Sequence, residues 1–441
     1  MSADGIDTQL AQWQAYLRKH STQTDDRLQA GIDELTTAGL APDESFLVAL
    51  KRLAAEEGPA REFARAHSAR LWRELVLNER SERGGNRPAL LTMLGCAALA
   101  AVAIKAPALF GVDFDDGDFY LRNLALFALA PLALYFGLRR QLRPAVVAAV
   151  AGLFALGAVA SNAYGLESDS QSVVLSAIHL PLALWLATGV AYAGGDWRSH
   201  HRRMDFIRFT GEWVVYLVLI GLGGGVLTGI TVGTFGAIGI DVETFTSEWL
   251  LPCGAVAAIV VAAWLVETRQ GVLETIAPML TRIFTPLFTV VLLALLVGFG
   301  LSSTGLEADR EVLILFDLLL VVILGLLLYG LSAIDRPDEP TLFDKLQLGL
   351  VVSALLVDVL VLTAITSRIT DYGSTPNKIA ALGENLILLA NLAWSAWLLL
   401  GFLRGRTAFT RLERWQTGYL VVYAAWAWIV VLIFPPLFGF R

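Results

Sequence analysis

Eleven apolar runs follow one another from residue 88 to the end of the chain, and most are long enough to cross a lipid bilayer. A hydrocarbon core of about 30 Å is crossed by roughly 20 residues of α-helix. Backbone amides in lipid must be hydrogen-bonded within the protein, which favours helices. The runs predict an all-α, polytopic transmembrane helical bundle of about eleven spans. They lie at residues 89–111, 122–138, 144–163, 173–194, 209–239, 248–266, 283–301, 312–331, 346–367, 378–402 and 415–437.

The composition agrees with this class of protein. Of 441 residues, 56% are hydrophobic and 17% are charged, whereas soluble domains average about 45–50% and about 25%. The mean hydropathy is +0.62. The net charge of -7 is mild and no long basic tract is present, so the sequence does not predict a nucleic-acid partner. The lipid bilayer is the partner that the composition predicts.

The first 87 residues differ from the rest of the chain. They are polar, and their apolar residues recur at helical spacing, as in Leu28, Ile32 and Leu35. They lack the apolar core of a signal peptide, so we expect them to be retained. We therefore predict a small soluble helical prefix domain at residues 1–87, followed by a transmembrane domain at residues 88–441.

The loops between the runs alternate between basic loops and loops poor in Lys and Arg. Lys and Arg stay with the cytoplasmic loops of membrane proteins. This pattern predicts a cytoplasmic N-terminus and, for eleven spans, a C-terminus on the other side. The basic loops lie near residues 139–143, 198–208, 269–282, 336–345 and 404–414. The other loops lie near residues 113–118, 167–169, 241–248 and 307–311.

The segment 221–239 is unusually rich in glycine. Gly221, Gly225, Gly229 and Gly233 recur every four residues and share one helix face. The spacing matches neither a dinucleotide fingerprint nor a P-loop. In lipid, Gly-x-x-x-Gly faces allow close contact between helices, so the segment predicts helix packing. A broken or pore-lining helix is the alternative.

The chain carries no recognised catalytic motif. His-Glu-x-x-His, Gly-x-Ser-x-Gly and Cys-x-x-Cys are missing from the sequence. Cys96 and Cys253 fall singly inside apolar runs, which favours a structural role. We therefore expect no enzymatic activity, no cofactor and no bound metal.

Five ionisable residues fall inside the apolar runs, where a charge costs about 2.5–3.5 kcal/mol on insertion scales. Counting about 1.5 Å per residue from the cytoplasmic face places all five at heights of roughly 18–24 Å. We expect the lysine to pair with one carboxylate, leaving a surplus that is protonated, solvated or matched by a bound cation. The alternative is structural, with the lysine reaching the interface and the acids pairing with neighbours. The five residues are Lys105, His179, Asp317, Asp358 and Glu384.

A tract before the tenth run has a local structural interpretation. Thr375 is placed to cap a helix whose first residue is Pro376. Gly373 allows a tight turn before that helix.

The same tract resembles a known signature. Tyr372, Gly373, Thr375 and Asn377 match the Tyr-Gly-x-Thr-x-Asn-Arg pattern of a bacterial polytopic inner-membrane family known only as a domain of unknown function. Lys378 stands where that family usually has Arg. Residues 1–87 are similar to the short helical prefix found ahead of bacterial permeases. The resemblance implies a location in the bacterial inner membrane and implies no established activity.

Two functional hypotheses follow. The first is a transporter or permease-like protein linked to protons or a small cation, based on the layer of ionisable residues. The alternative is a non-transporting membrane sensor or assembly factor whose residues 1–87 bind a cytoplasmic protein partner. A membrane-embedded enzyme acting on lipid has no supporting motif.

Overall fold

The computed structural model describes residues 22–38, 45, 48–49, 52, 87–112, 117–164, 170–268, 270–301, 310–333 and 340–439. The chain divides into two compact units, Met1–Leu90 and Leu91–Arg441. In the first unit, helix α2 (Thr22–Thr37) confirms the helix predicted around Ile32, and both Ile32 and Leu35 are buried. The other helices predicted for the prefix lie outside the described residues.

The second unit is helical in its described part. Eleven of its helices are long and apolar enough to cross a membrane, which confirms the eleven predicted spans. The main helices are α5 (Arg87–Lys105), α6 (Gly117–Arg140), α7 (Pro144–Ala163), α8 (Gln171–Tyr192), α9 (His200–Ala237), α11 (Leu251–Thr268), α12 (Gln270–Leu301), α13 (Arg310–Ala333), α14 (Leu342–Tyr372), α15 (Pro376–Leu403) and α16 (Thr410–Leu432). Short elements are η1 (Ala106–Phe110), α10 (Glu243–Phe245), η2 (Thr246–Leu250) and α17 (Phe434–Leu437).

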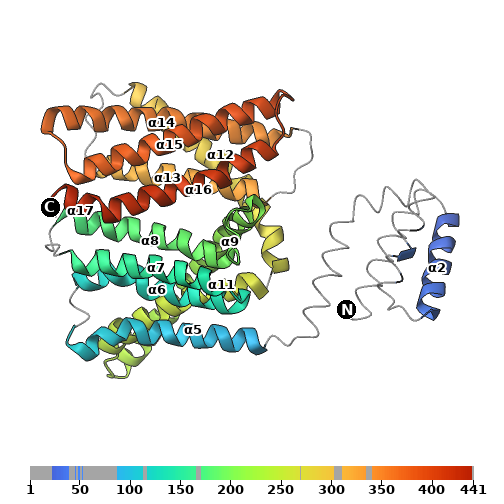
Figure 1. Cartoon of the computed structure of the whole chain (residues 1–441), viewed down its shortest axis with the longest axis horizontal. Helices are drawn as coiled ribbons and strands as arrows, with labels where there is room; N and C mark the ends of the chain where they lie inside the picture. The colour runs from blue at the N-terminus through green and yellow to red at the C-terminus, as the bar shows by residue number, and fades with distance from the viewer. Residues whose placement is uncertain are drawn as a thin grey trace. The chain divides into compact units, whose positions relative to one another are not determined.

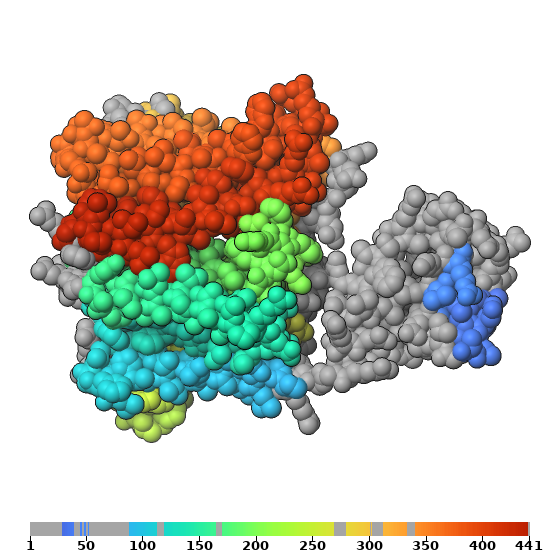
Figure 2. Space-filling model, in the orientation of Figure 1, coloured from blue at the N-terminus to red at the C-terminus, as the bar shows by residue number. Residues whose placement is uncertain are grey.

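The spans of this unit form two groups joined by α16 and α8. On one side α14 packs against α15 and α12, and α13 packs against α12 and α14. On the other side α6 packs against α7, α8 and α11, with α5 at the edge of the bundle (Figure 1). Helix α16 lies between α8 and α15 and contacts both. Figure 2 shows α16, in dark red, filling the space between the teal α7 and the orange α14–α15 pair on the face in view.

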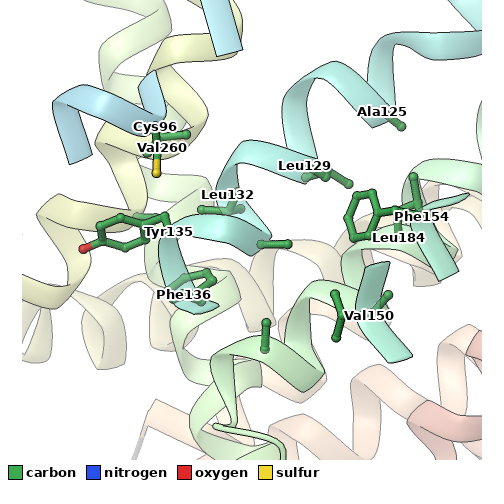
Figure 3. Packing of buried hydrophobic residues seen from close by; sticks show 14 of the residues in the cluster. Cys96, Ala125, Leu129, Leu132, Tyr135, Phe136, Val150, Phe154, Leu184 and Val260 are labelled. Atoms are coloured by element: carbon green, nitrogen blue, oxygen red, sulfur yellow. The ribbon is translucent and has the colours of Figure 1, made fainter. Parts of the chain in front are cut away.

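The core of the group that contains α5, α6, α7, α8 and α11 is a cluster of apolar side chains from these helices (Figure 3), to which α9 and α16 also contribute. Leu132, Tyr135 and Phe136 on α6 are fully buried in it. The hydroxyl of Tyr135 leaves this apolar cluster and donates a hydrogen bond of 2.6 Å to Glu267 Oε2 on α11. Glu267 also pairs with Arg140 at 3.0 Å. The buried Tyr135 hydroxyl therefore has a hydrogen-bond partner, Glu267, where α6 and α11 approach the basic 139–143 loop.

The glycine-rich part of α9 is not packed against the described part of the chain. A Cβ built on Gly221, Gly225, Gly229 or Gly233 would meet no described atom within 4 Å. None of the residues in the most apolar stretch of α9 is buried. No helix packs against this face among the described residues, and its role in helix packing stays a prediction.

The turn between α14 and α15 forms as the sequence predicts. Thr375 is the N-cap of α15 and its side chain accepts a hydrogen bond from the Lys378 amide, and Pro376 is the first helical residue. Gly373 has a φ of 74°, a conformation that glycine adopts without steric cost. Lys378 Nζ donates to the carbonyls of Gly373 and Arg368 at 2.8 and 3.1 Å, and it lies over the Tyr372 ring. The signature residues Tyr372, Gly373 and Thr375, together with Lys378, thus build one closed turn.

Candidate functional site

Three of the five predicted ionisable residues come together where α13, α14 and α15 pack. Asp317 lies on α13, Asp358 on α14 and Glu384 on α15. These three helices contact one another, and Asp317 is hydrogen-bonded to Asn385, the residue that follows Glu384 on α15. We call the three acids, contributed by three packed helices, the carboxyl cluster.

Asp317 is held by an amide. Asn385, fully buried on α15, donates from Nδ2 to Asp317 Oδ1 at 2.8 Å and to the carbonyl of Ala381 in its own helix. Its Oδ1 is also buried and has no hydrogen-bond partner among the described residues. A buried amide oxygen without a donor costs free energy. Asn385 therefore presents an unused acceptor next to the carboxyl cluster.

Asp358 is the most deeply enclosed of the three acids. Its side chain is fully buried, and neither carboxylate oxygen has a hydrogen-bond partner in the described part of the chain. An ionised carboxylate buried without a partner is costly, and such groups take up a proton or acquire a counter-ion. Val357 and Val361, the neighbours of Asp358 along α14, are buried in an apolar cluster together with Leu388 of α15. The environment of Asp358 therefore favours a neutral carboxyl group.

A buried hydrogen-bonded ladder extends from this cluster along the α15–α16 contact. The amides of Asn391 and Gln416 bond each other reciprocally, at 3.1 Å from Asn391 Nδ2 and at 2.8 Å from Gln416 Nε2. Gln416 Nε2 also donates to Ser395 Oγ at 2.6 Å. Asn391 Nδ2 donates in addition to Tyr423 Oη at 2.9 Å. Asn391, Ser395 and Gln416 are fully buried, so the ladder is enclosed by α15 and α16.

Tyr423 accepts a hydrogen bond from Asn391 of this ladder, and its ring packs against the apolar cluster that includes Val357 and Leu388. Helices α15 and α16 approach closely at this level, because a Cβ on Gly383 would overlap the ring of Trp426. The absent side chain at Gly383 thus brings α16 against the part of α15 that carries Glu384.

The other two predicted residues lie elsewhere, on α5 and α8. Lys105 ends α5, and its Nζ lies 4.5 Å from the centroid of the Trp249 ring. Helix α5 lies on the opposite side of the bundle from α14 and α15 (Figure 1). His179 is buried on α8, and its Nδ1 lies 2.8 Å from the carbonyl of Leu175. Equal height in the membrane did not imply contact, because height leaves open which helices are neighbours.

Sequence reasoning missed part of this site. The sequence analysis did not connect Ser395 or Gln416 to the acids. The available signal was the presence of two amides and a glutamine within strongly apolar runs, since such groups need partners in lipid.

Among the residues that the structure describes, no group of three His, Cys, Asp or Glu side chains is close enough to hold a metal ion. Comparison of the chain with protein-family models, curated proteins and solved structures finds no match in any of the three. The likeness of the Tyr372–Lys378 turn to a family signature therefore stays an expectation, and the function must be inferred from the site itself.

Proposed function

We propose that this multi-pass membrane protein is a proton-linked transporter, in which Asp317, Asp358 and Glu384 bind and release the proton. The supporting observation is Asp358, a fully buried carboxyl whose two oxygens lack partners among the described residues. A fixed structural acid in lipid is expected to be paired. An acid that must change its charge during a cycle needs an environment that tolerates the neutral form.

The amide of Asn385 supports the same assignment. Its Nδ2 donates to Asp317, so Asp317 acts as the acceptor in this state. Its free Oδ1 requires a donor, and a protonated carboxyl group is the donor that the cluster can supply. Coulomb repulsion also disfavours three ionised acids at this site in a medium of low dielectric constant. One or more protons are therefore the species that neutralises the cluster.

A proton is favoured over a metal ion for a geometric reason. The described acids are not grouped closely enough for three of them to share a metal, whereas protons need only one carboxyl group each. In this proposal the protein lies in the bacterial inner membrane with its N-terminus in the cytoplasm, as its basic loops predict. The alternative of a sensor with a partner bound to residues 1–87 depends largely on residues outside the described part.

The test is proton movement in proteoliposomes. Full-length protein is reconstituted with an enclosed pH-sensitive dye, and a potential is imposed with potassium and valinomycin. Amino acids, sugars, nucleosides and sodium are added in turn. We expect at least one class to trigger proton uptake, and Asp358→Asn and Glu384→Gln to reduce it to the level of empty liposomes.

Glu243→Gln is the control, because Glu243 is exposed in the short α10. It should leave proton uptake unchanged. Uptake that both cluster variants retain in full, or that no added class triggers, would overturn the proposal. Sodium entry without proton movement would replace the proton by a monovalent cation.

A further inference from the structure

A groove of about 610 Å³ lies between helices α6 and α7. Its floor is buried, because Ala133 of α6 and Val150 of α7 are each 7% exposed. Its rims are exposed, with Leu138 at 57% and Val147 at 48%. Exposed apolar rims around a hollow are typical of a surface that meets a membrane or another apolar molecule. In a chain that crosses the bilayer, this groove therefore opens toward lipid.

The groove exists because small side chains line it on both helices. Ala130, Ala133 and Gly137 follow one another at helical spacing along α6, and Ala151 lines the wall on α7. The atoms around an unfilled apolar space lack contacts on one side. A chain of methylene groups that enters the groove gains those contacts.

The length of the groove matches one leaflet of a bilayer. Along α6 it extends from Gln141 to Ala130, which corresponds to roughly 16 Å of helix. Half of a hydrocarbon core of about 30 Å is about 15 Å. Ala130 and Phe154 also line a second cavity, where η1 meets α6 and α7, so the groove ends near the middle of the bilayer. One acyl chain of one leaflet is thus an apolar group of the right length.

The end of the groove at Gln141 carries an excess of positive charge. Gln141 stands between Arg140, the last residue of α6, and Arg143, the N-cap of α7. Arg139 and Arg140 both pair with Glu267, at 3.6 and 3.0 Å. Arg143 is exposed and pairs with no acidic side chain in the described part of the protein. The charge at this end therefore complements an anionic headgroup.

We propose that the α6–α7 groove binds one anionic phospholipid, whose acyl chain lies against Ala133, Gly137 and Ala151 and whose phosphate pairs with Arg143. The side-chain amide of Gln141 lines the same end and supplies hydrogen-bond donors for the oxygens of the headgroup. The site lies in the leaflet that borders the basic loops. It does not depend on proton transport, and it assigns a ligand to a part of the bundle away from the carboxyl cluster.

The experiment is photo-crosslinking of the full-length protein in phosphatidylcholine liposomes. A small fraction of phosphatidylglycerol carries a diazirine in one acyl chain, and a parallel sample carries the same diazirine on phosphatidylcholine. Labelled peptides are identified by mass spectrometry. The exposed stretch of α9 around Leu222 and Val226 is the internal reference for lipid that only surrounds the protein. We expect phosphatidylglycerol to label residues 130–138 and 147–154 in clear excess over that reference.

Two variants with matched controls test the two parts of the site. Arg143→Gln should lower the preference of the groove for phosphatidylglycerol over phosphatidylcholine about fivefold. Arg404→Gln should leave it unchanged, because Arg404 is an exposed arginine of another basic loop. Ala151→Trp should remove most of the labelling by filling the groove. Ala149→Trp should not, because Ala149 is exposed on α7 and does not line the groove.

Several results would overturn the inference. The headgroup assignment fails if both lipids label the groove equally, or if Arg143→Gln and Arg404→Gln lower the preference alike. The groove assignment fails if its peptides are labelled no more than the α9 reference, or if Ala151→Trp and Ala149→Trp give the same labelling. Protection of the groove from both lipids would show that a second copy of the chain covers it instead. If Ala151→Trp does not fold, Val147→Trp at the exposed rim replaces it, with the same expected loss.

Discussion

Replacing Asn391 with leucine is the most direct test of the buried ladder. Three hydrogen bonds cross from α15 to α16 through this side chain, two to Gln416 and one to Tyr423. Hydrogen bonds between membrane helices average about 0.6 kcal/mol each. Asn391→Leu should therefore lower the free energy of unfolding by about 2 kcal/mol.

The same argument predicts how two substitutions combine. In Asn391→Leu the Oε1 atom of Gln416 loses its partner while Nε2 keeps Ser395. Replacing Gln416 with leucine as well removes this Oε1 atom, which would otherwise be buried without a hydrogen-bond partner. The double variant should then be more stable than the sum of the single losses by about 1 kcal/mol.

The assay is unfolding in mixed detergent micelles with increasing SDS, followed by circular dichroism. Thr366→Val on α14 is the control, because Thr366 is exposed and its hydroxyl bonds only the carbonyl of Leu362 in its own helix. It should change the free energy by less than about 0.5 kcal/mol. If Asn391→Leu matched this control, or if the two leucine substitutions were simply additive, the ladder would not connect the helices as described.

Three further predictions use the same protein. Gly383→Val should lower the free energy of unfolding by about 1–3 kcal/mol, because the new side chain would overlap a tryptophan of α16. The control Gly418→Val should cost clearly less, because a Cβ at Gly418 meets no described atom within 4 Å. Equal losses in the two variants would count against the close contact between α15 and α16. Thr375→Ala should cost about 1 kcal/mol in the same unfolding assay through loss of the N-cap of α15, and an unchanged stability would contradict that role. With both native cysteines replaced, Gln141→Cys and Ile240→Cys should react with an impermeant maleimide from opposite sides of the membrane; labelling of both from one side would disprove the predicted sidedness.

The sequence was sufficient for the features that depend on short stretches of chain. Each apolar run had a length and composition that only a helix could satisfy in lipid, and the eleven spans followed. The turn at Gly373 and the cap at Thr375 followed from local backbone chemistry. These features need no knowledge of which helices are neighbours.

The contacts between helices were harder to predict from the sequence. Asp317, Asp358 and Glu384 could be placed at a common height, yet height alone also included Lys105, which lies against Trp249 on α5's side of the bundle. The reciprocal bonding of Asn391 and Gln416 depends on the rotation of α15 and α16 about their axes. A helix that is apolar on all sides gives little periodic signal for that rotation, so the ladder was visible only in the folded chain.

The length of helix α9 makes its orientation sensitive to the thickness of the surrounding bilayer. Its apolar stretch from Phe209 to Ala237 would measure roughly 43 Å if straight, against a hydrocarbon core of about 30 Å, a mismatch that tilting of the helix relieves. Its buried residues, such as Phe206 and Ile207, lie toward the N-terminal end, and its most apolar stretch has none, so a change in the inclination of that stretch would break few contacts within the described chain. Shorter acyl chains should therefore tip α9 further over, while the tightly packed α14–α15 hairpin keeps its internal geometry.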